Sequence, residues 1–277
     1  MAYKRVLTIQ DISCVGQCSL TVALPIISAC GVETAILPSA VLSTHTGGFK
    51  GFTFRDLTDD IPAIAAHWRS EGIKFDAIYT GYLGSTKQID FVADILETMG
   101  NETCVRVIDP AMADNGKLYV GFDDAYVAAM RKLCTKADVL LPNITEACFL
   151  TGEEFKTEYD RAYIDALLEK LVAMGVKTVV LTGVSYRKDK TGVVVYDHGV
   201  YHYYEHRKIA KGCHGTGDVY ASAFVGALMQ GKSLNDSARI AADYTVECIE
   251  NTQGDPTHWY GVKFETALAS LMNMIHE

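Results

Sequence analysis

The sequence has few features of a membrane, secreted or nucleic-acid-binding protein. No stretch approaches the ~20 consecutive apolar residues that span a bilayer, so we expect no membrane segment. Lys and Arg number 25 against 34 Asp and Glu, and the resulting net charge of −9 argues against a nucleic-acid partner. The sequence contains neither a Cys-x-x-Cys pair nor a recognisable signal peptide, so we expect a cytoplasmic protein.

What the sequence does contain is a regular alternation of strands and helices. Hydrophobic residues make up 49% of the 277, which is enough for a substantial core. Strands are predicted at 6–9, 34–37, 76–79, 104–108, 139–141 and 178–181, with a hairpin at 191–197 and 200–204. Helices are predicted at 17–30, 57–71, 86–99, 123–135, 160–174, 217–230, 235–250 and 263–275, and a glycine-rich loop at 42–51. This order predicts one α/β domain over residues 1–277, with a mostly parallel sheet covered by helices on both faces.

Several polar residues fall just after predicted strands. They are Asp11, Tyr82, Asp109, Asn143, Glu146 and Thr182. In parallel sheets, ligands lie beyond the carboxyl ends of the strands. Any one of these residues alone is better explained as a loop residue without a task. Six of them at one edge of a sheet favour a binding cleft.

A glycine-rich turn leads into an apolar helix late in the chain. Gly215, Thr216, Gly217 and Asp218 precede a run rich in alanine. Such a turn collects unpaired backbone N–H groups at the positive end of the helix dipole, where phosphate binds. Asp218 would lie beside that phosphate, where it could take a proton from an attacking hydroxyl. The alternative is a tight loop in which Asp218 caps the helix.

This turn resembles the signature of the ribokinase superfamily of small-molecule kinases, and the resemblance implies a ribokinase-like three-layer fold. It implies Asp218 as the general base and Gly215, Thr216 and Gly217 as an anion hole. Asp109-Pro110 and Asn143-x-x-Glu146 resemble segments near the metal and the triphosphate, which implies ATP and Mg²⁺ with Asp109 and Glu146 at the metal. Thr182-Gly183 and Lys211 fall on the donor side. Asp109 could equally open a turn, and Asn143 with Glu146 could form a helix capping box.

Within the superfamily, the chain most resembles the vitamin B6 kinases, over essentially its whole length. Thr80-Gly81-Tyr82-Leu83-Gly84-Ser85 resembles the segment whose tyrosine packs on the pyridine ring. The segment 43–46 resembles a substrate-side loop and brings His45 and Thr46 to the ligand, although a loop histidine is more often solvated. The resemblance implies phosphorylation of the 5′-hydroxymethyl group of pyridoxal, pyridoxine or pyridoxamine by a homodimer. It leaves the use of a monovalent cation such as K⁺ open.

Asp11 departs from the pattern of many B6 kinases, which have Ser after Gln at this place. A carboxylate here could bind the 3-hydroxyl or a protonated ring nitrogen, or cap the following helix. It keeps open a hydroxymethylpyrimidine kinase of thiamin synthesis, or a bifunctional enzyme. A sugar kinase is disfavoured because no small lid sheet follows the first strand. A binding protein without turnover is disfavoured because it has no need of an acid beside its phosphate site.

Overall fold

The computed structural model describes residues 3–209 and 213–277, and most strands in this part form one sheet of nine. Its order is β11-β10-β9-β8-β5-β4-β1-β2-β3. The strands are β1 (Arg5–Val15), β2 (Glu33–Thr44), β3 (Phe54–Asp56), β4 (Phe75–Thr80), β5 (Gly100–Ile108), β8 (Val139–Leu140), β9 (Thr178–Val184), β10 (Lys190–Asp197) and β11 (Val200–Arg207). A separate small ribbon pairs β6 (Ala113–Asp114) with β7 (Lys117–Leu118).

The middle of the sheet is parallel and its borders are antiparallel. All pairs from β9 through β8, β5, β4 and β1 to β2 are parallel. The predicted hairpin is present as β10 and β11, and β3 pairs antiparallel with β2. The carboxyl ends of six parallel strands therefore meet at one edge, which is where ligands bind in open α/β sheets.

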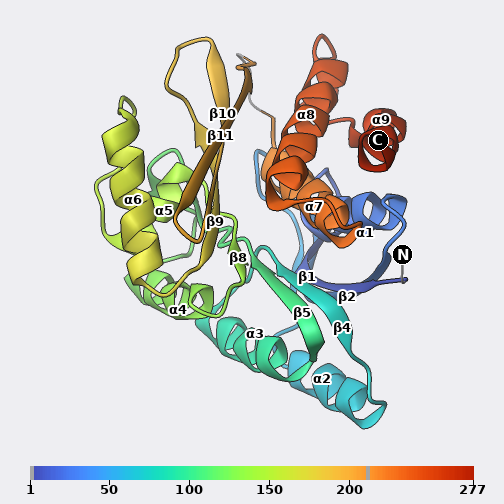
Figure 1. The fold of residues 1–277 in the computed structure, drawn as a ribbon. Helices are drawn as coiled ribbons and strands as arrows, with labels where there is room; N and C mark the ends of the chain where they lie inside the picture. Colours follow the sequence, from blue (N-terminus) through green and yellow to red (C-terminus); the bar gives the residue numbers. More distant parts are fainter. Residues whose placement is uncertain (1–2, 210–212) are drawn as a thin grey trace.

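Helices cover both faces of the sheet (Figure 1). One face carries α2 (Ile61–Ser70), α3 (Thr86–Thr98), α4 (Asp124–Cys134), α5 (Ile144–Thr151) and α6 (Arg161–Ala173). The other carries α1 (Leu20–Ala29), α7 (Thr216–Met229), α8 (Leu234–Thr252) and α9 (Leu268–His276), the last preceded by a 3₁₀ turn at Phe264–Ala267. Each helix layer packs its own apolar core against the sheet. The predicted α/β class, with a mostly parallel sheet between two helix layers, is confirmed.

The close packing of α7 on α1 places the start of α7 over the end of β1. Most of α7 is buried, as its run of small and apolar residues predicts. A Cβ added at Gly226 would lie only 2.4 Å from the Cys30 sulfur, so glycine permits this approach of the two helices. The glycine-rich turn at the start of α7 consequently lies beside the loop that joins β1 to α1.

Several predicted boundaries are wrong because long-range pairing extends the strands. β1 continues to Val15 and β2 to Thr44, so Asp11 lies within a strand and 42–44 are not loop. The register of β1 against β2 shifts between Gln10 and Ile12, and such an irregularity re-aims the side chain at that point. Ser19, not Asp11, is the N-cap of α1. β3, β6 and β7 were not predicted, and the final helix is shorter than expected.

Within residues 3–209 and 213–277, no helix combines the length and the apolar character that crossing a membrane requires.

Candidate active site

The turn of Gly215, Thr216 and Gly217 at the start of α7, called the anion turn below, has the geometry of an anion site. Gly215 is the N-cap of α7 with φ +74°, and a Cβ there would lie 1.7 Å from the Gln17 carbonyl oxygen. Gly217 is exposed, and an added Cβ would meet no atom within 4 Å. Among the described residues, no side chain caps the first turn of α7. The first N–H groups of α7 thus lack a capping side chain at the positive end of the helix dipole, where an anion can bind them.

Asp218 lies in the first turn of α7 with its side chain part-buried. Its Oδ2 accepts a hydrogen bond of 2.9 Å from the backbone N–H of Ser19, and within the described residues no group donates to Oδ1. Burial raises the pKa of Asp218 to about 7; the Ser19 N–H lowers it and the nearby charge of Asp11 raises it. A carboxyl group that titrates near neutrality is suited to accept and release a proton.

Asp11 is buried at the same edge of the sheet, between two serine hydroxyls. Ser13 Oγ donates to Oδ2 at 2.9 Å, and Ser19 Oγ donates to Oδ1 at 2.5 Å. Burial raises the pKa of Asp11, while the hydrogen bonds from Ser19 and Ser13 oppose that rise. Ser19 therefore contacts both Asp11 and Asp218, a role that the sequence analysis did not predict.

His45 is buried, so the alternative of a solvated loop histidine does not hold. Its Nδ1 accepts the N–H of Gly47 at 3.0 Å, so Nε2 carries the proton and donates to the Tyr260 carbonyl oxygen at 2.7 Å. Burial lowers the pKa of His45, which favours this neutral form. The ring also lies 5.4 Å from that of His214, which precedes the anion turn. Thr46, the next residue, is exposed.

Tyr82 follows β4 and lies in a stack of aromatic rings. Its ring lies 5.5 Å from that of Phe122 with an interplanar angle of 26°, and Phe122 stacks on Tyr126 at 3.7 Å. Burial and then the charge of Asp11 raise the pKa of Tyr82, which places the phenol near that carboxylate. Phe122 was missed by the sequence analysis. Its one available signal is an aromatic residue directly before Asp123, the N-cap of α4.

Asp109 and Glu146 interact electrostatically with each other, and Asp109 also with Asp218. Burial is the main cause that raises the pKa of both Asp109 and Glu146, and each neighbouring charge adds to it. Asp109, which directly follows β5, therefore lies near one carboxyl group from α5 and another from α7. Tyr119, which the sequence analysis also missed, lies near Asp109 and Glu146. Burial is the main cause that raises the pKa of Tyr119, and the charges of Glu146 and Asp109 raise it further.

A metal ion would fit Asp109 better than Glu146. Asp109 Oδ1 accepts the N–H of Ala111 at 3.0 Å, while no group among the described residues donates to Oδ2. Both oxygens of Glu146 accept backbone N–H groups, from Met112 at 3.1 Å and Asn143 at 2.9 Å. Within the described chain, no cluster of three or more His, Cys, Asp or Glu is arranged to hold a metal. One carboxylate with retained waters is nonetheless a common Mg²⁺ site, and Glu146 could reach such an ion through water.

The predicted capping box of Asn143 and Glu146 is present at the start of α5. Asn143 also donates to the Ala113 carbonyl at 2.9 Å, which ties α5 to the β6–β7 ribbon. Thr182 pairs with Asn143 as the last step of the parallel sheet, so it lies within β9 and not after it. Gly183 is exposed with φ +75°. Lys211 lies outside the described residues.

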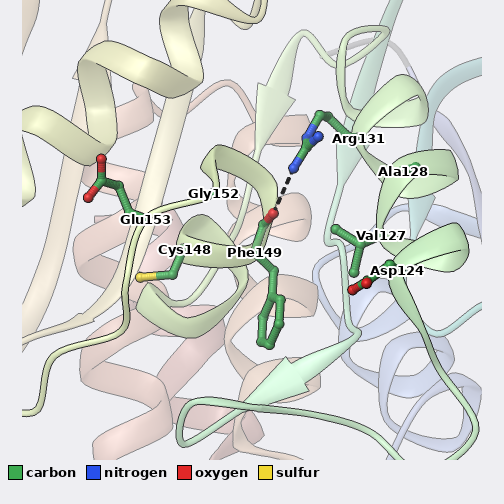
Figure 2. A pocket seen from close by; sticks show the side chains of 8 residues that line it. All are labelled: Asp124, Val127, Ala128, Arg131, Cys148, Phe149, Gly152 and Glu153. Carbon is green, nitrogen blue, oxygen red and sulfur yellow. Dashed lines mark hydrogen bonds between the residues drawn. The ribbon is translucent and has the colours of Figure 1, made fainter.

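A small pocket lies next to the anion turn. It has a volume of about 180 Å³, and Thr216 lines it together with Val246 and Ile249 of α8 and a basic run at the end of β11. A larger pocket of about 390 Å³ lies between α4 and α5 and contains none of the predicted site residues (Figure 2). There Arg131 donates to the carbonyls of Leu150 and Phe149, so its guanidinium caps the end of α5.

Comparisons with known proteins show what the whole chain resembles. Residues 24–261 match the family model described as phosphomethylpyrimidine kinase. One similar crystal structure is that of a Bacteroides thetaiotaomicron protein with pyridoxal, a protein provisionally named a phosphomethylpyrimidine kinase. It is 37% identical to this chain with a TM-score of 0.92, and the match covers 98% of this chain and 96% of the Bacteroides chain. The pyridoxal kinase of Lactobacillus plantarum is 33% identical with a TM-score of 0.91, covering 99% and 98%. The hydroxymethylpyrimidine/phosphomethylpyrimidine kinase of Bacillus subtilis is 27% identical over 83% of both chains.

Proposed function

The chain belongs to the phosphomethylpyrimidine kinase family, and we propose that it acts as a single domain that phosphorylates the 5′-hydroxymethyl group of pyridoxal, pyridoxine or pyridoxamine with ATP. Its ribokinase-like fold and its place among the pyridoxal and hydroxymethylpyrimidine kinases follow from the matches above. The observation that carries the proposal is Asp218, a carboxyl with a pKa of about 7 in the first turn of a helix with an open, glycine-lined N-terminus. The likeness to a 37% identical structure with pyridoxal supports a B6 vitamer as the acceptor.

The proposed chemistry is an in-line transfer of the γ-phosphoryl group from ATP to the hydroxymethyl oxygen of the acceptor. Asp218 Oδ1 accepts the proton of the hydroxymethyl group while Oδ2 stays on the Ser19 N–H. The alcohol oxygen then forms a bond to the γ-phosphorus, and the bond to the β–γ bridging oxygen of ATP breaks. The N–H groups of the turn from Gly215 to Asp218 stabilise negative charge on the transferred phosphoryl oxygens.

The acceptor ring would lie against Tyr82. Offset stacking on a tyrosine contributes about 0.5–1.5 kcal/mol beyond the burial of area. Phe122 holds the ring of Tyr82 in place from one side. Asp11 already accepts hydrogen bonds from the hydroxyls of Ser13 and Ser19. Its carboxylate oxygens can still accept one more hydrogen bond, from the 3-hydroxyl or from a protonated ring nitrogen of the acceptor. His45 and Thr46 would border the ring from the segment that follows β2.

The donor would lie between the anion turn and the strand ends of β8 and β9. The pocket beside Thr216, with apolar Val246 and Ile249 and a basic rim, suits the flat base of a nucleotide. Asn143, Thr182, Gly183 and Lys211 stay predictions for contacts with ATP. When Mg²⁺ is bound, it screens the charge of the donor phosphates, and Asp109, with Glu146 through water, would hold it. The homodimer and the cytoplasmic location also stay predictions.

A hydroxymethylpyrimidine kinase is the second candidate, and two observations favour it. The matching family model carries that description, and Asp11 provides a carboxylate that could accept a hydrogen bond from an amino group on a pyrimidine ring. Such an enzyme would use the same Asp218 and the same turn. The two candidates therefore differ in the acceptor and not in the mechanism.

The test is a coupled ADP-release assay with four acceptors: pyridoxal, pyridoxine, pyridoxamine and hydroxymethylpyrimidine. We expect the highest kcat/KM with a B6 vitamer, and Asp218→Asn should bind the acceptor yet lose most turnover. A preference for hydroxymethylpyrimidine would transfer the proposal to the second candidate. Full activity of Asp218→Asn would remove the assignment of the base, and no ADP release with any acceptor would refute the kinase proposal.

A further inference from the structure

Ser19 has a backbone conformation that L-residues rarely adopt. Its φ is 55° and its ψ is −133°. Four non-glycine residues in the described chain have positive φ. Two of them, Asn115 and His198, lie at the tips of β-hairpins, where this conformation is common. A strained backbone outside such turns is often found at functional sites.

Ala111 also lies in a local turn, because its N–H bonds the carboxyl of Asp109 two residues earlier, so Ser19 is the one non-glycine residue with positive φ in the described chain that no turn explains. Ser19 donates its backbone N–H to Asp218, and Ala111 donates its backbone N–H to Asp109. The two contacts differ in range, because Ala111 reaches a carboxylate two residues away and Ser19 reaches one 199 residues away. The conformation of Ser19 therefore directs its N–H at a carboxylate that only the fold brings near.

The helix start at Ser19 does not account for its side chain. Ser19 is the N-cap of α1, but its hydroxyl makes no capping hydrogen bond. The hydroxyl donates to Asp11 at 2.5 Å instead. The Ser19 carbonyl meanwhile accepts the N–H groups of Val22 and Ala23. The residue is therefore held by α1 on one side and by Asp11 on the other, with its N–H left for Asp218.

We propose that Ser19 is a positioning residue that orients the Asp218 carboxyl through its backbone N–H, and that Asp11 locks Ser19 in the required conformation. Asp11 would then have two tasks, binding the acceptor ring and fixing the base. This inference rests on the proposed function. It adds that the ring-binding carboxylate and the base are connected through one residue, so their relative position is set before substrate binds.

The test compares three variants: Ser19→Ala, Ser19→Gly and Ser13→Ala. Alanine loses the hydroxyl and still resists positive φ, so the N–H should leave Asp218 and kcat should fall by about tenfold or more. Glycine loses the same hydroxyl but adopts this φ freely, so its kcat should stay within about threefold of the parent. Ser13→Ala is the matched control, because it removes the other hydroxyl on Asp11 without touching Asp218. It should raise the acceptor KM and spare kcat.

A double variant tests the lock even if Ser19→Ala does not fold. Asp11→Ala should lower kcat and raise the acceptor KM, and adding Ser19→Gly should restore kcat by about fivefold or more without restoring KM. Equal kcat for Ser19→Ala and Ser19→Gly, an equal loss in Ser13→Ala, or no recovery in the double variant would each overturn the inference. An inactive parent enzyme would instead refute the proposed function, so the two failures are distinguishable. KM for ATP should be unchanged throughout.

Discussion

Replacing the proposed base should make the folded protein more stable at alkaline pH. The folded chain holds a proton on Asp218 up to a pKa of about 7, whereas the ordinary value is 3.8. Unfolding between these pH values releases that proton, so this group's contribution to stability falls as pH rises from about 4 to about 7. The shift corresponds to at most roughly 4 kcal/mol, because solvent reaches part of the side chain and screens it. Asp218→Asn removes the charge and hence this penalty.

The measurement is urea unfolding of Asp218→Asn and the parent at pH 8 and at pH 4.5. The variant should have the higher free energy of unfolding at pH 8, by up to roughly 4 kcal/mol, and the difference should shrink to about 1 kcal/mol or less at pH 4.5, which is just above the ordinary pKa of 3.8. Asp236→Asn is the control, since Asp236 also lies in the first turn of a helix but is exposed. A variant that is no more stable than the parent at pH 8 would refute the conclusion that burial raises the pKa of Asp218.

Three further outcomes are expected. The kcat of the parent enzyme should rise with pH and level off above about 7, because only ionised Asp218 accepts the proton. One pH unit below the pKa of Asp218, kcat should be roughly a tenth of its plateau value. A flat kcat profile from pH 5.5 to 8 would exclude this role. Tyr82→Ala should raise the acceptor KM by about two- to tenfold through loss of stacking, while Tyr82→Phe should not; an unchanged KM in Tyr82→Ala argues against stacking. Gly215→Ala should lower the free energy of unfolding by more than about 1 kcal/mol, because its Cβ would overlap the Gln17 carbonyl at a φ of +74°. Gly217→Ala, which meets no protein atom, should fold normally yet raise KM for ATP, and equal thermal stability of the two glycine variants would contradict this steric reasoning.

Local patterns in the sequence were enough to predict the layers of the fold and the strand ends that carry Tyr82, Asp109 and Asn143. They predicted the glycine turn and its helix as well, because glycine spacing and apolar composition are properties of neighbouring residues. They also predicted the capping box at Asn143 and Glu146, which is read from two residues three apart.

Contacts between distant segments could not be predicted in this way. His45 is buried in contact with Tyr260, more than 200 residues later in the chain, whose carbonyl oxygen accepts a hydrogen bond from His45 Nε2. Asp11 lies within β1 because pairing with β2 continues past an irregular step. Ser19 had no signal at all, since a serine near a helix start is ordinary. Its importance comes from two carboxylates that the fold brings to it.

The hydrogen bond between Ser19 and Asp218 joins positions 199 residues apart. During synthesis on a ribosome, the first strand and its serine emerge long before the helix that completes the arrangement. Partial chains that end before Thr216 consequently lack both the proton acceptor and the helices α7 to α9 that shield one side of the sheet. A prematurely terminated product should therefore lack the proposed activity, and its uncovered apolar surface should expose it to aggregation and to proteases.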